Sequence, residues 1–187
     1  MIAICVGHSR PGDMGAVSIG GVSEHVFNQR LARSIAADLI ERGRPATVIS
    51  SYQGSNYSAA MRWLAAEHRR IGATVTVELH FNSSDTAQAS GHEWLFWVVS
   101  TQGRFLAKAL DSRMSAAFPE LPRRGIKSIH QGDRGAEFLR LTPCPAIICE
   151  PFFGSNDRDW DLATNQQDKL AGVIAQGLDD FMVGGSL

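Results

Sequence analysis

Short apolar runs alternate with longer amphipathic segments along most of the chain. A short apolar run predicts a strand buried on both faces, and apolar residues three or four positions apart predict a helix that buries one side. The runs predict strands at residues 1–7, 45–50, 73–81, 92–99 and 145–149, with a short edge strand at 136–142. The amphipathic segments predict helices at residues 24–42, 58–72 and 102–118, and a last helix that ends near Phe181.

Polar residues and glycines mark the ends of these helices. Ser23 precedes the first helix and can cap its N-terminus, and Gly43 follows its last turn. Thr164 and Gln167 have the spacing of a capping box, so we expect the last helix to begin there.

Strands that alternate with helices indicate the α/β class. We expect a three-layer sandwich in which helices flank a mainly parallel, mixed central sheet. The 187 residues suit a single catalytic domain over residues 1–183, followed by a loose C-terminal tail over 184–187.

The charge balance and the apolar runs exclude several classes of partner. The formal net charge is -1, which gives no basic surface for nucleic acid. The one basic cluster, formed by Arg123, Arg124 and Lys127, reads as a solvated loop rather than an anion site. No apolar run approaches the roughly 18 residues needed to cross a membrane, so stable membrane insertion is not expected.

The N-terminus and the cysteines indicate where the chain is made. The first residues lack the basic region and the cleavage site of a signal peptide, so we expect synthesis in the cytoplasm without one. Cys5 and Cys149 lie in apolar runs, and the three cysteines are odd in number, which fits reduced thiols.

Four polar residues lie where the predicted strands end or the first helix begins. His8 follows the first strand, Glu24 starts the first helix, and His80 and Glu150 end two further strands. Ligands bind at the carboxyl ends of the strands in open α/β sheets. Two histidines and one glutamate, with a second carboxylate for proton transfer, form a set that is typical of catalytic zinc.

Each of these residues also has a structural interpretation. A single histidine at a strand end is more often a hydrogen-bonded structural residue, and Glu24 suits any helix N-terminus. His25 competes with Glu24, but adjacent helical residues point in different directions, so only one can face the site. His68 lies in a predicted helix beside two arginines, which suits the surface or helix packing, and His92 and His130 have no convincing partner pattern. A rival thiolate site, formed by Cys144 and Cys149, lacks a second cysteine pair.

Four segments, taken in order, resemble the zinc-dependent N-acetylmuramoyl-L-alanine amidases of the Amidase_3 type. The segment GHSRPGDMGAVSIGGVSEHVFNQRLARSIAADLIERG resembles the opening of these amidases, with its GH, GA and G-x-x-E elements and its N-x-x-L-A helix. In this chain, VELHFNSS is similar to the family's second histidine segment and SGHEWLFW to its G-x-E strand. PCPAIICEPFFGSNDRDW is similar to the family's segment with the second glutamate. The resemblance covers residues 5 to 160.

The resemblance implies a role for each residue of the set. It implies that His8, Glu24 and His80 bind one Zn²⁺ ion and that Glu150 is the catalytic carboxylate. Asn82, just after His80, is a candidate for substrate binding, although an asparagine there also suits a turn.

Arg124 is a second candidate for substrate binding. It is also the candidate partner in an alternative interpretation of Glu150, in which that carboxylate only forms an ion pair.

The chain departs from the family pattern at three places. Cys5 and Val6 stand where the family usually has Asp-Pro, Ser9 replaces a glycine after the first histidine, and Phe152 replaces a glycine after the second glutamate. These changes affect the loop shape and the substrate subsites and remove no ligand. The chain also lacks a long inhibitory insertion, so we expect no need for an activator.

The implied substrate is peptidoglycan, cut between N-acetylmuramic acid and L-alanine. A zinc D,D- or L,D-peptidase that acts on the stem peptide is one alternative, but the His-to-Asp spacing common in those enzymes is absent between His8 and Asp13. A cell-wall-binding module that has lost catalysis is another. A wall hydrolase of this design resembles a phage or prophage endolysin that acts on the wall after release by a pore-forming partner.

Overall fold

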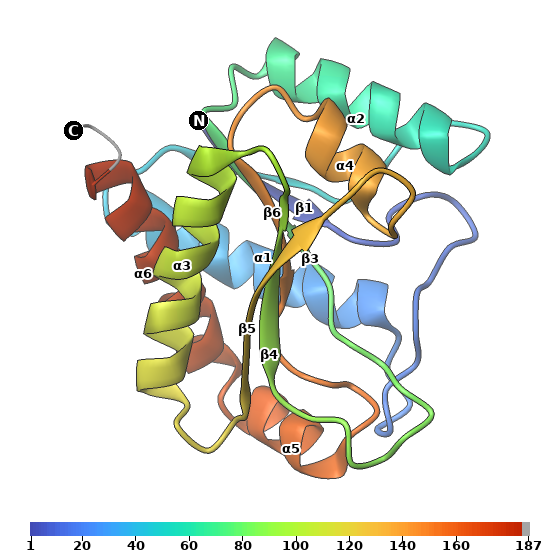
Figure 1. Cartoon of the computed structure of the whole chain (residues 1–187), viewed down its shortest axis with the longest axis vertical. Coiled ribbons are helices and arrows are strands. Elements are labelled where there is room, and N and C mark those ends of the chain that lie inside the picture. Colours follow the sequence, from blue (N-terminus) through green and yellow to red (C-terminus); the bar gives the residue numbers. More distant parts are fainter. Residues whose placement is uncertain (185–187) are drawn as a thin grey trace.

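A single sheet lies between two groups of helices (Figure 1). The computed structural model describes residues 1–184. The sheet contains β1 (Ile2–Val6), β2 (Ala46–Ile49), β3 (Val75–Leu79), β4 (His92–Trp97), β5 (Arg123–Ile129) and β6 (Ala146–Glu150). The helices are α1 (Glu24–Glu41), α2 (Tyr57–Arg70), α3 (Thr101–Ala117), α4 (Ala136–Leu141), α5 (Asp157–Asn165) and α6 (Gln167–Gly184). None of these described helices is both long and apolar enough to cross a membrane.

The strand order is β2-β1-β3-β6-β4-β5. The first four strands in this order are parallel, β4 runs antiparallel to β6, and β5 is parallel to β4. The predicted mainly parallel, mixed sheet is therefore confirmed. Its parallel half brings the carboxyl ends of β1, β3 and β6 to one edge.

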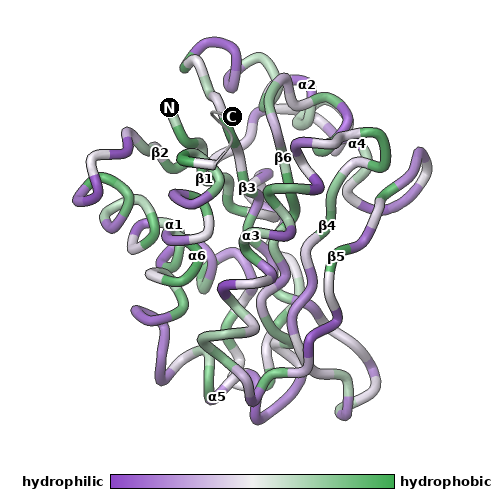
Figure 2. Tube along the Cα trace, turned by 60° about the vertical axis from the view of Figure 1, so that its left-hand side comes forward, coloured by the Kyte–Doolittle hydropathy of each residue, from purple (hydrophilic) through white to green (hydrophobic). Residues whose placement is uncertain are grey.

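The central strands are buried on both faces because helices cover both sides of the sheet. All residues of β1 and β3 are buried. Ile2, Ile4 and Val6 enter the core under α1, α3 and α6, whereas Ala3 and Cys5 enter the core under α2 and α4. Figure 2 shows the matching pattern along α1 and α6, where hydrophobic and hydrophilic residues alternate.

The predicted edge strand at 136–142 is wrong, because this segment forms α4. Gly135 lies in the left-handed region with φ 80° and starts the helix, which buries Ala136, Phe138 and Leu139. A segment this short does not show whether its apolar residues follow the period of a helix or that of a strand. The strand at the edge of the sheet next to β4 is β5, which is formed by the basic segment that was predicted to be a loop.

The predicted start of the last helix is also wrong. Thr164 lies inside α5, and its hydroxyl donates to the carbonyl oxygen of Trp160 at 2.8 Å. Asn156 caps α5, and α6 begins at Gln167. Gly184 of the predicted tail belongs to α6, and the other tail residues, 185–187, lie outside the described residues.

The cysteines are free, and Cys5 and Cys149 are buried, as expected. Of the two places expected for His68, the structure shows helix packing: the residue is buried, and its Nε2 lies 3.2 Å from the sulfur of Cys5. This contact lies under α2 and is part of the core.

Candidate metal centre

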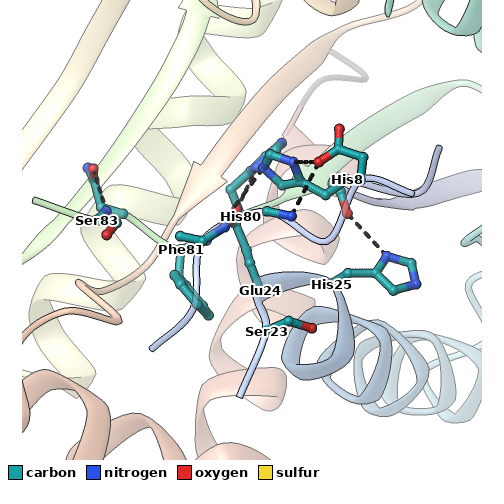
Figure 3. Close-up of polar contacts among 12 residues, drawn as sticks. His8, Ser23, Glu24, His25, His80, Phe81 and Ser83 are labelled. Atoms are coloured by element: carbon teal, nitrogen blue, oxygen red, sulfur yellow. Dashed lines mark hydrogen bonds and ion pairs between the residues drawn. The ribbon is translucent and has the colours of Figure 1, made fainter. Parts of the chain in front are cut away.

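Three side chains meet where β1 and β3 end and α1 begins. His8 follows β1, His80 follows β3, and Glu24 is the first residue of α1. Glu24 Oε2 lies 3.3 Å from His8 Nε2, and Glu24 Oε1 lies 2.8 Å from His80 Nδ1. Figure 3 shows the three side chains turned toward one another. The structure therefore brings the predicted ligands together, although their role as ligands stays a prediction.

The backbone around His8 is shaped for this meeting. His8 adopts φ 57°, a left-handed conformation that costs energy for a residue with a Cβ atom and that often marks a functional site. A Cβ on Gly7 would lie 2.3 Å from His80, and one on Gly15 would lie 2.6 Å from His8. Only glycine fits at these two positions, so the loop closes tightly around both imidazoles.

Glu24 is held from several directions. It is 3% exposed, and it accepts hydrogen bonds from the backbone N–H groups of Ala16 at 3.1 Å and Phe81 at 3.2 Å. Ser23 caps α1, which fixes where the helix begins. His25 points away from the site, with Nδ1 3.4 Å from the Gly7 carbonyl oxygen (Figure 3). As expected, only one of the two neighbours faces the site.

Each histidine also contacts a second carboxylate through its other nitrogen. His8 Nδ1 lies 2.8 Å from Asp13 Oδ1, and His80 Nε2 lies 3.3 Å from Glu78 Oε2. If these nitrogens donate protons to Asp13 and Glu78, Nε2 of His8 and Nδ1 of His80 are left to bind a cation in place of the protons that they share with Glu24.

Together, the hydrogen bonds and charges within the cluster shift the pKa values of its members more than burial does. Burial alone would lower the pKa of His80, but hydrogen bonds with Glu24 and Glu78 raise this pKa well above its ordinary value. Burial would raise the pKa of Glu24, but hydrogen bonds from His8 and His80 hold it far below its ordinary value. Glu24 is thus ionised and available to a cation.

The donor set fits a zinc ion. One potential ligand atom from each of His8, Glu24 and His80 lies within 4.8 Å of the others, close enough for one ion to reach all three. The two rings are nearly perpendicular, at 82°. Two imidazoles and one carboxylate leave a fourth tetrahedral position open, as catalytic zinc requires.

Glu150 ends β6 beside this cluster and lines the same cleft, whose volume is about 800 Å³. The pKa of Glu150 is raised to about 7, because burial and the nearby carboxylates of Glu93 and Glu24 outweigh the opposite effect of His80. Within the described residues the side chain of Glu150 has no hydrogen bond or ion pair, so Arg124 is not its partner. A half-buried carboxylate with a pKa near neutrality suits proton transfer.

The two candidate substrate residues both contact Glu93, which pairs with Glu150 across β4 and β6. Asn82 Nδ2 donates to Glu93 Oε1 at 2.7 Å, and Arg124 Nε donates to Glu93 Oε2 at 2.8 Å. Asn82 lines the cleft, whereas Arg124 lies over the ring of Phe153 at 5.0 Å. Their role in substrate binding stays a prediction. In the structure, both side chains hydrogen-bond to Glu93.

Sequence reasoning missed Asp13, Glu78 and Glu93, although Glu78 gave a signal. It interrupts an apolar strand just as Glu150 ends one, and a buried carboxylate needs a partner. Asp13 gave no such signal, and Glu93, although it is the glutamate of the G-x-E strand, was given no role because its partners come from other segments.

The other candidate residues lie apart from the cluster. His92 is buried in β4 with its Nδ1 3.1 Å from Trp94 Nε1, and His130 is exposed. Among the described residues, the group formed by His8, Glu24 and His80 is the one set of three placed to hold a metal, so no thiolate site forms around Cys144 and Cys149.

Comparison with known proteins identifies the family of the chain. The model of the family Amidase_3, described as N-acetylmuramoyl-L-alanine amidase, matches residues 2–180. No curated protein matches the chain significantly.

Solved structures match over almost the whole chain. The amidase AmiC2 of Nostoc punctiforme is 21% identical over 97% of both chains, with a TM-score of 0.81. The catalytic domain of CD27L, an endolysin that targets Clostridia difficile, is 25% identical over 96% of both chains, with a TM-score of 0.81. The amidase Ami1 from Mycobacterium smegmatis is 16% identical over 100% of this chain and 98% of its own, with the same TM-score of 0.81. The fold and the family model agree, and the chain belongs to the N-acetylmuramoyl-L-alanine amidase family.

Proposed function

We propose that the chain is a zinc-dependent amidase that cleaves peptidoglycan between N-acetylmuramic acid and L-alanine. The observation that carries the proposal is the meeting of His8, Glu24 and His80 in one cleft with Glu150. Membership of the amidase family supports the choice of bond.

The residues of the cleft divide the chemistry between them. His8, Glu24 and His80 would hold the ion, and a zinc ion in such a site polarises a carbonyl group and lowers the pKa of water. Glu150 accepts a proton from the attacking water and delivers it to the departing amine of L-alanine. The raised pKa of Glu150 suits both halves of this transfer, because the carboxyl group must gain and lose a proton near neutral pH. Glu93, fixed by Asn82 and Arg124, keeps a second carboxylate beside it.

Mass spectrometry of digested peptidoglycan tests the bond. We expect intact stem peptides that begin with free L-alanine, together with glycan strands that keep their lactyl groups. Shortened peptides still attached to glycan would identify a stem-peptide peptidase instead. Walls that bind the protein and release nothing would identify a binding module.

We further propose that the chain acts on the wall as an endolysin, made in the cytoplasm and released by a pore-forming partner. The likeness to the endolysin CD27L supports this role. Expressed alone in a bacterium, the protein should leave cells intact, and lysis should follow once the inner membrane is permeabilised. Spontaneous lysis, with protein recovered outside the inner membrane, would contradict this role.

A further inference from the structure

A buried carboxylate lies behind His80, on the side away from Glu24. Glu78 precedes His80 by two residues in the sheet segment, and its side chain is only 5% exposed. Tyr52, which is 2% exposed, donates its hydroxyl hydrogen to Glu78 Oε1 at 2.9 Å. Glu78 Oε2 lies 3.3 Å from His80 Nε2. The proposed reaction does not use either residue.

Removing a carboxylate from water costs several kcal/mol unless hydrogen bonds compensate. Among the described residues, Glu78 forms no ion pair with lysine or arginine. Its partners are the Tyr52 hydroxyl and the His80 ring. The rest of β3 is built from valine, threonine and leucine, and an apolar residue at position 78 would avoid this cost. The placement of Glu78 therefore indicates a role in metal binding by His80.

We propose that Glu78 and Tyr52 form a positioning pair that fixes the tautomer and the orientation of His80 for metal binding. Accepting the Nε2 proton leaves Nδ1, the atom hydrogen-bonded to Glu24 at 2.8 Å, as the ring nitrogen that can bind a metal ion in place of its proton. Tyr52 occupies the other carboxylate oxygen, so Glu78 keeps one orientation toward the ring. This role deepens the proposed function and depends on zinc binding in the cleft.

His8 has a more exposed support of the same kind, although its contact is shorter, at 2.8 Å against 3.3 Å for His80 and Glu78. Its Nδ1 partner, Asp13, belongs to the loop after β1, and the Asp13 side chain is 32% exposed. Water competes for an exposed hydrogen bond and screens its charge, whereas the contact of Glu78 lies in the protein interior. The two histidines therefore differ in how firmly they are held, and Glu78 has the larger effect on zinc affinity.

Zinc dissociation constants measured by competition with a chromogenic chelator test the pair. Glu78→Gln should weaken zinc binding 10- to 100-fold, the usual effect of losing such a partner. Asp13→Asn and Tyr52→Phe should act in the same direction with smaller changes. Thr76→Val is the matched control, since Thr76 is buried on the same strand and bonds Cys5 rather than His80. It should lower the melting temperature of the apoprotein and leave the zinc affinity unchanged.

A folded Glu78→Gln variant that binds zinc within twofold of the parent overturns the positioning role. If Glu78→Gln does not fold, Tyr52→Phe decides, because it keeps the ring and removes only the hydroxyl. An unchanged zinc affinity in Tyr52→Phe then overturns the pair, and a severalfold loss supports it. A parent protein that binds no zinc would instead contradict the proposed function.

Discussion

Glu150→Gln is expected to give a folded protein that binds zinc and digests peptidoglycan on the order of 10² to 10⁴ times more slowly than the parent. Glutamine keeps the size and shape of the side chain but removes the basic oxygen. The side chain of Glu150 has no hydrogen bond or ion pair among the described residues, so its replacement breaks no polar contact that supports the fold. The measurements are the rate of wall lysis, the zinc content and the melting temperature of the same variant.

The pH profile adds a second readout for Glu150. A general base must be ionised, so the parent rate should fall as the pH drops through the pKa of this carboxyl group. That pKa is raised to about 7, chiefly by burial, and the charge of a bound zinc ion would move it lower. The residual activity of Glu150→Gln should lack this acidic limb.

Glu137→Gln is the matched control for Glu150→Gln, because Glu137 lines the same cleft and contacts Ser58 rather than the cluster. It should stay within a few-fold of the parent rate. An unstable Glu150→Gln variant with normal turnover per folded molecule would mean that the residue serves the fold and not the reaction.

His80→Ala is expected to lose most of the affinity for zinc. Structural zinc sites contribute about 10–16 kcal/mol over four ligands, so one ligand contributes roughly a quarter of that, on the order of 10² to 10³ in affinity. The apoprotein should stay folded, since the sheet and its two cores form without the ion. Zinc content after dialysis, together with chelator titration and restoration of activity by added zinc, measures the effect.

His25→Ala provides the control for His80→Ala. His25 is adjacent to Glu24 in the chain but points away from the cluster, so this variant should bind as much zinc as the parent. Equal zinc content in His80→Ala and the parent would show that the ligand set is wrong. Unfolding on chelation would show that the ion supports the fold.

The sequence predicted the central fold well because the central strands are apolar along their whole length. Val75, Val77 and Leu79 mark β3, and the polar residues that follow such strands mark the edge where the site lies. Helix α4 and strand β5 were missed for a different reason. The segment of α4 is too short to show a period, and the edge position of β5 leaves Arg123 and Arg124 exposed.

The proximity of His8, Glu24 and His80 could be anticipated from topology, but their supporting contacts could not. Tyr52 reaches Glu78 from the segment after β2, and Asn82, which follows β3, reaches Glu93 of β4 across the end of β6. Such pairs depend on the register and rotamers of segments that are distant in the chain. No local pattern encodes them.

The reversal of direction at β4 has an evolutionary consequence. Because β4 runs against β6, Glu93 near the start of one strand stands opposite Glu150 at the end of the other. The connection that delivers Glu93, residues 83–91, is therefore a surface loop beside the cleft and carries none of the three predicted ligands. Surface loops of this kind tolerate insertions. Insertions or deletions in residues 84–90 are thus expected to leave the reaction centre in place.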